Sequence, residues 1–326
     1  METQDSGFES IRAMRLAAWL TAVFVILVWG VTFANTRSLL MDFSPLEIQV
    51  IRFAAAWLLL VVVGLVCKRK DGCVRTTWCD EVLFAAMGLT GVAVYQLLEN
   101  CAIYYTNASN VAILVSFGPI VTAVLTRLLL KDNSLSMPLV VGSIVSVCGV
   151  ALVAHNGCLN FDLRPLGDIM ALCAMASWGF YSVLVAKANK RGIPQITVIR
   201  KSFFWALVLM SPLLVWGATE SGYYALDGSF SIELDVSANV ARFARPLNWL
   251  NLGFLGVLAS AVCFVLWSRA CKSLGVVRTT IVLYFTPIVG VIFAVLFLGE
   301  RLTAMSMAGG GLIIAGVAIT HIKRRL

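Results

Sequence analysis

Long apolar runs separated by short polar segments make up almost the whole chain. A membrane hydrocarbon core of about 30 Å requires roughly 20 apolar residues in helical form. Because backbone groups in lipid must hydrogen-bond within their own segment, helices are the structure that such runs predict. The expected fold class is an all-α integral membrane protein with ten transmembrane helices. The predicted spans cover residues 17–35, 45–67, 81–104, 109–130, 137–154, 166–186, 195–216, 247–271, 276–298 and 303–321.

The composition agrees with this prediction. Of the 326 residues, 60% are hydrophobic and 13% are charged, whereas soluble domains carry about 25% charged residues. The net charge of +8 does not indicate nucleic-acid binding, because the basic residues form short clusters between apolar runs. Such clusters are typical of the signal that orients membrane helices.

The basic loops predict an orientation. With the N-terminus inside, the inner loops hold the clusters at 68–70, 187–191 and 323–325, and the outer loops hold scattered arginines. Loops rich in Lys and Arg stay in the cytoplasm. We therefore expect a multi-pass protein of the plasma (inner) membrane with both termini cytoplasmic. The one long loop, 217–246, would lie outside, where the alternation at 230–236 fits either a short amphipathic strand or an irregular loop.

Two halves of the chain share a pattern. Pro119 is followed by Ile-Val, an apolar run and an acidic turn at Asp132, and the same order recurs 168 residues later from Pro287 to Glu300. With five spans in each half, the two acidic turns fall on opposite sides, as inverted membrane repeats require. The predicted organisation is a cytoplasmic tail (1–16), a first five-helix repeat (17–156), a second, inverted repeat (157–322) containing the external loop, and a cytoplasmic tail (323–326).

Further matched residues identify a family resemblance. Trp29-Gly30 in the first span corresponds to Trp178-Gly179 in the sixth, and a Gly-Glu-Arg turn at 299–301 precedes a Gly-rich last helix. With ten spans and the two proline-containing helices, this organisation resembles the EamA group of the drug/metabolite transporter superfamily. The resemblance implies transport of metabolites, amino acids or amphipathic toxic compounds, with export favoured and uptake as the alternative. The first half departs from the pattern, with Lys131-Asp132-Asn133 where Gly-Glu would be expected.

The prolines mark candidate hinges. Pro119 interrupts the fourth span and Pro287 the ninth, and Gly118 and Thr286 precede them. A proline inside a helix removes a backbone hydrogen bond and clashes with the preceding turn. Paired interruptions at matched positions favour a hinge or a substrate site. The alternative is a kink that membrane helices tolerate.

Glu99 is the most informative single residue. A carboxylate within a span costs about 2.5–3.5 kcal/mol at a helix centre, so we expect Glu99 to face a wet cavity or a partner. Tyr95, Glu99 and Ala102 share a helix face, and Asn100 follows directly. Trp267 occupies the position matched to Glu99, so an acid and an aromatic would flank a cationic, zwitterionic or aromatic solute. The alternative is an interfacial carboxylate near solvent or Arg37.

Other intramembrane residues are weaker candidates for the substrate cavity. Arg52 and Arg200 lie at similar depths in the second and seventh spans, where they could bind an anion, lock the structure or extend to the headgroups. Aromatic residues near mid-span need a polar partner for their N–H or O–H group, which a cavity would supply. These are Trp29, Trp178, Tyr181 and Tyr284.

The fifth and tenth helices resemble a scaffold. Gly142 with Ser146, and Gly311 with Ala315, form small-residue faces that permit close backbone approach. We expect these helices to pack against each other within the chain, so that the monomer is functional, although the same faces could make a homodimer.

The function predicted is a secondary carrier that moves a small organic solute by alternating access through a central cavity. The chain has no Gly-rich nucleotide loop, its two histidines lie at helix ends, and the spacing of Cys67, Cys73 and Cys79 does not fit zinc. We therefore expect no enzyme activity, cofactor, metal or nucleic-acid partner. The partners would be the solute and the lipid bilayer. The alternative function is a structural or regulatory membrane protein without transport.

Overall fold

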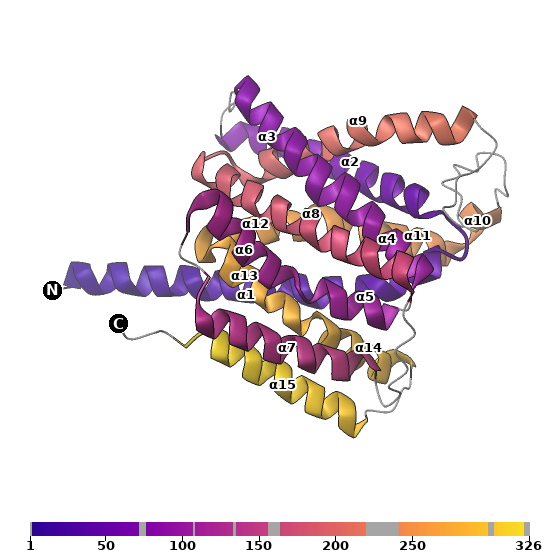
Figure 1. The fold of residues 1–326 in the computed structure, drawn as a ribbon. Helices are drawn as coiled ribbons and strands as arrows, with labels where there is room; N and C mark the ends of the chain where they lie inside the picture. Colours follow the sequence, from indigo (N-terminus) through magenta and orange to yellow (C-terminus); the bar gives the residue numbers. More distant parts are fainter. Residues whose placement is uncertain are drawn as a thin grey trace.

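A computed structural model describes residues 2–71, 76–106, 108–132, 135–155, 164–219, 241–298 and 303–322. Within these ranges every regular element is a helix, and the helices form a bundle in which most run along a common direction (Figure 1). The start of the first helix and the end of the last lie at the same side of the bundle. The predicted strand at 230–236 and the turn at 299–301 lie outside the described residues.

In its described residues, the first half contains seven α-helices and one π-helical segment. The third span is one continuous helical rod with a π-helical centre, and the fourth span is divided in two. The elements are α1 (Glu2–Leu39), α2 (Pro45–Asp71), α3 (Trp78–Gly88), η1 (Leu89–Val94), α4 (Tyr95–Tyr105), α5 (Ala108–Val115), α6 (Gly118–Leu130) and α7 (Met137–His155).

The second half repeats these features. Its third long helix also has a π-helical centre, and the following helix contains a 3₁₀ segment. The elements are α8 (Pro165–Lys190), α9 (Gln195–Thr219), α10 (Ala241–Ala244), α11 (Pro246–Gly253), η2 (Phe254–Val262), α12 (Cys263–Leu274), α13 (Val276–Thr280), η3 (Ile281–Phe285), α14 (Thr286–Leu298) and α15 (Ala304–Thr320).

The predicted spans agree with these helices to within a few residues at most ends. In the described part of the chain, nine helical segments are long and apolar enough to cross a membrane. The helix Ala304–Thr320 is apolar but shorter, with 17 residues. The described part of the chain is thus all-helical and the protein is multi-pass, and a tenth crossing by α15 stays a prediction.

Both prolines lie where their spans are interrupted, but neither kinks a continuous α-helix. The fourth span breaks after Val115, and Pro119 falls in the first turn of α6. Pro287 falls in the first turn of α14, directly after the 3₁₀ segment η3. A first-turn proline gives up no intrahelical hydrogen bond, because the N–H at that position has no partner in the helix. Each proline therefore starts a helix after an existing break.

Element boundaries recur with the spacing seen in the sequence. The helices α3 and α11 begin 168 residues apart, as do α6 and α14, and the two π-helical segments end 168 residues apart. π-Helical segments are rare and are often found at functional sites. A shared apolar composition does not explain why the two π-helical segments recur at matched positions.

The helices α7 and α15 lie side by side (Figure 1) through glycines on their facing surfaces. A Cβ on Gly149 would lie 2.6 Å from the carbonyl oxygen of Gly309, and one on Gly142 would lie 2.4 Å from that of Gly316. The prediction that the fifth and tenth helices pack together is correct. The face predicted for α15 was wrong, because Gly311 and Ala315 are exposed on its other side.

Glycines also bring helices from opposite halves together. A Cβ on Gly30 in α1 would lie 2.6 Å from Val289 in α14, and a Cβ on Gly179 in α8 would lie 2.8 Å from Val121 in α6. The sixth span thus packs on the fourth as the first packs on the ninth. These are the two Trp-Gly pairs that matched in the sequence, so close helix contact explains the glycines.

Polar contacts at matched positions in the two halves connect helices at both ends of the bundle. At one end Arg191, after α8, forms an ion pair with Asp80 in the first turn of α3. At the other end, Asn248 in the first turn of α11 donates to Asp42, after α1, at 2.9 Å. The hydrogen bond from Asn248 is the largest influence on Asp42 and lowers the pKa of its carboxyl. Arg245 and Arg242 lower the pKa further, while desolvation opposes them.

We expect Asn248→Ala to destabilise the protein more where Asp42 is ionised than where it is protonated, since the second hydrogen bond of Asn248, to the Arg242 carbonyl oxygen at 2.8 Å, does not depend on the ionisation of Asp42. A carboxyl whose pKa is lower in the folded state stabilises that state above the unfolded pKa of about 3.9, and this stabilisation is lost as the pH falls through the folded pKa. Thermal unfolding in detergent should therefore show a deficit near pH 6 that narrows on acidification. In an Asp42→Asn background, the same change should give a deficit independent of pH. A deficit that persists unchanged in acid would contradict the assignment.

Candidate binding cavity

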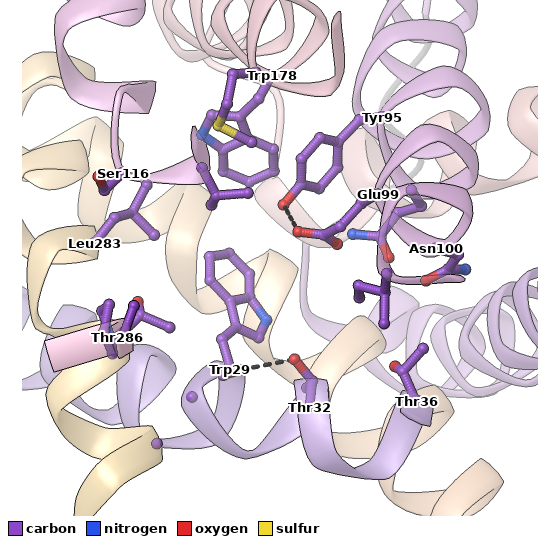
Figure 2. A pocket seen from close by; sticks show the side chains of 18 of the residues that line it. Trp29, Thr32, Thr36, Tyr95, Glu99, Asn100, Ser116, Trp178, Leu283 and Thr286 are labelled. Atoms are coloured by element: carbon purple, nitrogen blue, oxygen red, sulfur yellow. Dashed lines mark hydrogen bonds between the residues drawn. The ribbon is translucent and has the colours of Figure 1, made fainter. Parts of the chain in front are cut away.

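A cavity of about 370 Å³ lies among helices from both halves of the chain. Its lining is mostly apolar and aromatic, with a few hydroxyl groups, one carboxylate and one guanidinium. In α14 the lining residues include Pro287 and Gly290, immediately after the interruption of the ninth span. The lining side chains that Figure 2 labels are Trp29, Thr32, Thr36, Tyr95, Glu99, Asn100, Ser116, Trp178, Leu283 and Thr286.

Glu99 lies on the cavity wall with Tyr95. The two residues are one turn apart on α4, and the Tyr95 hydroxyl donates to Glu99 Oε1 at 2.6 Å (Figure 2). The π-helical segment η1 ends at the residue before Tyr95. A π turn contains extra residues per turn, so it rotates the helix face that follows it. The predicted face is right for Tyr95 and Glu99, but Ala102 is fully buried and Ile103 lines the cavity instead.

Arg52 reaches the same cavity from α2. Only 5% of the residue is exposed. Its Nε donates to Ser260 Oγ at 2.5 Å and its Nη1 to Gln96 Oε1 at 2.9 Å. Extension to the headgroups is therefore wrong for Arg52. Arg200, the matched residue, does not line the cavity, and its Nη1 lies against Gly64 of α2.

Aromatic rings form one side of the cavity and continue behind it. Trp29 and Trp178 both line the cavity, and their ring centres are 5.8 Å apart. Trp267 packs behind Trp29 at 5.1 Å, and Tyr181 packs behind Trp178 at 5.1 Å. The N–H of Trp29 donates to the Ala259 carbonyl oxygen at 3.0 Å, the polar partner that a mid-span tryptophan needs.

The structure thus brings together some of the predicted site residues and not others. Those that line the cavity are Trp29, Arg52, Tyr95, Glu99, Asn100, Trp178 and Pro287. Those outside the lining are Trp267, Tyr181, Tyr284, Arg200, Pro119 and Gly118. Gly118 still lies close to the wall, because a Cβ there would be 3.3 Å from the sulfur of Met175, a lining residue.

Sequence reasoning missed several lining residues. Gln96 holds Arg52, and Phe264 packs on Trp29 with 5.7 Å between ring centres. Ser116 lies at the break in the fourth span and Thr32 one turn beyond Trp29. A polar residue beside each helix interruption was a usable signal for Ser116. Phe264 had no such signal, since phenylalanine is a common residue in apolar spans.

The cavity lining includes one acidic and one basic side chain. Glu99 and Arg52 attract each other electrostatically, but each hydrogen-bonds to neutral neighbours, and no ion pair joins the two in the described part of the chain. Among the described residues there is no group of three or more His, Cys, Asp or Glu side chains able to hold a metal. The arrangement can bind an organic solute through opposite charges and aromatic faces.

Curated proteins similar to this chain are transporters by description. An uncharacterized transporter from Archaeoglobus fulgidus is 24% identical over 94% of this chain and 99% of its own length. The uncharacterized transporter YdfC from Bacillus subtilis is 24% identical, with 91% of this chain and 88% of that protein covered. A protein described as a probable terminal-alkyne amino-acid exporter, from Streptantibioticus cattleyicolor, is 26% identical, with 95% and 94% covered.

The fold and the family agree with these relatives. A crystal structure of a protein with 18% sequence identity superposes with a TM-score of 0.73, covering 96% of this chain and 100% of the other, which shows a shared fold. The model of the EamA-like transporter family matches twice, at residues 16–154 and 165–322. Together the two matches include the whole cavity and both halves of the bundle. The chain therefore belongs to the EamA-like transporter family.

Proposed function

We propose that this protein is a secondary carrier for a small organic solute with a charged amino group, and that amino acids are the class its cavity fits best. The observation that carries the proposal is the presence of Glu99 and Arg52, with opposite charges, in one largely apolar cavity. Glu99 would bind the ammonium group. Arg52 would bind the carboxylate through Nη2, which has no hydrogen bond among the described residues.

The aromatic wall would hold the rest of the solute. A cation over the face of a tryptophan is attracted to the ring by about 0.5–2 kcal/mol, and Trp29 and Trp178 present such rings beside Glu99. Amines and amphipathic cations are the alternative substrates, because they need Glu99 and the rings but not Arg52. Export is the favoured direction, supported by the exporter among the relatives.

The cycle that we propose is alternating access between two inverted five-helix repeats with ten spans. Support comes from the two family matches, from the element boundaries that recur 168 residues apart and from the equivalent glycine contacts between the halves. The repeats correspond to residues 17–156 and 157–322. The basic loops favour cytoplasmic termini in the plasma membrane, with the cavity facing outward because it lies toward the α1–α2 end of the bundle.

Arg52→Lys tests the substrate class. The change keeps a positive charge but removes the planar fork that can bind a carboxylate while holding Gln96. In liposomes containing the purified protein, we expect flux of an amino acid to fall about tenfold, as loss of a charged hydrogen bond predicts. Flux of the corresponding decarboxylated amine should change less. Equal losses for both solutes would contradict carboxylate binding by Arg52.

The same liposomes test transport itself. A panel of labelled amino acids, amines and sugars that showed no flux with wild-type protein would favour the alternative, a structural or regulatory membrane protein. Protein that has unfolded during purification would give the same result, so a cooperative thermal transition of the sample is the necessary control.

A further inference from the structure

Of the seven buried hydroxyl groups that lack hydrogen-bond partners in the described part of the chain, five lie toward one end of the bundle. These five belong to Thr122, Thr126, Ser143, Tyr181 and Tyr284, and we refer to them as the buried hydroxyl set. None of the five residues is more than 1% exposed. The hydroxyls of Tyr284 and Ser143 lie near each other, but not in the geometry of a hydrogen bond. Burying a polar group without a partner is unfavourable, so this set requires an explanation.

The buried hydroxyl set lies on one side of the cavity. Thr122 and Thr126 follow the α6 start by one and two turns, and Tyr181 is one turn beyond Trp178 in α8. Tyr284 lies two residues before Thr286 in the ninth span. The helix α13, at the start of this span, packs against both α6 and α8, the helices that hold Thr122, Thr126 and Tyr181. Ser143 lies near the start of α7, whose far end supplies Val153 and Ala154 to the cavity. All five are therefore displaced from the cavity toward the α12–α13 end of the bundle.

The amide of Asn189, near the C-terminal end of α8, also lacks partners among the described residues and lies on the same side of the cavity as the set, whereas the remaining unpartnered polar groups lie elsewhere. Trp178 and Thr286 line the cavity itself, although their unpartnered atoms are buried. Ser146 lies in the contact between α7 and α15. Gln49 uses its amide nitrogen on the Val92 carbonyl, and Arg242 pairs with Glu47 at the opposite end.

The matched halves give an independent reason to group these residues. With the spacing of 168, Thr122 corresponds to Gly290 and Tyr284 to Ser116. With the spacing of 149 between Trp29 and Trp178, Tyr181 corresponds to Thr32. Gly290, Ser116 and Thr32 all line the cavity. Three of the five hydroxyls thus occupy the positions that, in the opposite half, form the cavity wall.

We propose that the buried hydroxyl set lines the second half of the solute path, which is closed in this structure and opens toward the α12–α13 end when the cavity closes. The proposal rests on the proposed carrier function. It explains why the hydroxyls have no partner here, because water and the polar groups of the solute would satisfy them in the open state. The five side chains carry no formal charge, so this half of the path would take hydrated polar solutes and release them without an ionic contact.

The native protein contains a probe for this opening. Cys271 in α12 is 3% exposed and lies within electrostatic range of Tyr181. It corresponds to Ile103, a cavity-lining residue 168 positions earlier. Cys101 in α4 is 5% exposed and does not line the cavity, which makes it an internal control.

We expect a small, membrane-impermeant maleimide to modify Cys271 only from the α12–α13 face of membrane vesicles, with Cys101 unmodified. Right-side-out and inverted vesicles, followed by peptide mass spectrometry, distinguish the faces. Modification of Cys271 no faster than Cys101, or equally fast from both faces, would overturn the proposal. Labelling of Cys271 needs no solute. Solute flux without labelling of Cys271 would therefore refute the proposed path and leave the carrier function standing. Labelling without flux supports the opening and refutes only the carrier function.

Two hydroxyl-deletion variants connect the probe to the buried hydroxyl set. Thr122→Val and Tyr284→Phe should each slow Cys271 modification by roughly fivefold or more. Each change removes a hydroxyl that lacks a hydrogen bond only in the closed state, so it stabilises the closed state relative to the open one. Thr280→Val is the matched control. Thr280 is also fully buried nearby, but its hydroxyl donates to the Val277 carbonyl oxygen at 2.9 Å, so its loss should not slow modification. Unchanged rates in both hydroxyl-deletion variants would contradict the role of these groups.

Discussion

Replacing Glu99 with glutamine should reduce flux of an amino-group substrate by about tenfold or more, because the ammonium group loses a charged hydrogen-bond acceptor worth about 1.5–3 kcal/mol. The side chains have nearly the same shape, and the glutamine oxygen can still accept the Tyr95 hydroxyl, which lies 2.6 Å from Oε1. The fold should therefore persist. Initial rates in liposomes, normalised to the amount of folded protein, measure the effect.

Glu81→Gln is the control for removing a carboxylate from the same span. Glu81 lies at the other end of this span, where it pairs with Lys201 and accepts from the Trp205 N–H at 2.9 Å. It does not line the cavity, so its loss should affect stability more than flux. If Glu99→Gln transported at the wild-type rate between about pH 5.5 and pH 8, where a free carboxylate is ionised, neither solute binding nor proton transfer could be assigned to Glu99.

The fold was largely predictable because lipid imposes a simple rule on sequence. Every span had to be a long apolar helix, and the predicted interval 137–154 coincides with the candidate span Met137–Ala154. The breaks within spans were less predictable. Pro119 and Pro287 marked their positions, but the π-helical segments η1 and η2 have no proline. Such segments depend on how whole helices pack, which residue periodicity does not encode.

Residues of the candidate site were predictable where a charged residue interrupts an apolar span. Glu99 and Arg52 differ from their apolar surroundings, and both line the cavity. Aromatic residues carried less information, because a tryptophan in a span fits a cavity wall and a helix interface equally well. Trp29 lines the cavity whereas Trp267, also aromatic and near mid-span, packs behind it. Trp267 is 1% exposed and contacts the Trp29 ring, so the packing of the helices, not the residue type, decides which ring lines the cavity.

Gly309→Ala should destabilise the bundle, and Gly310→Ala, one residue further along the same helix, should not. A Cβ on Gly309 would lie 2.6 Å from the Gly149 carbonyl oxygen and 2.9 Å from the Val153 nitrogen. These are backbone atoms, so α7 and α15 would have to separate, and overpacking of this kind costs about 1–3 kcal/mol. A Cβ on Gly310 meets nothing within 4 Å.

The paired variants separate packing from helix propensity. Alanine is favoured over glycine inside a helix by about 0.5–1 kcal/mol, so Gly310→Ala should leave the melting temperature unchanged or raise it. Gly309→Ala has the same propensity gain and should nevertheless lower the melting temperature in detergent. Equal melting temperatures for the two variants would mean that α7 and α15 do not meet through Gly149 and Gly309, and that the pairing of the fifth and tenth helices is wrong.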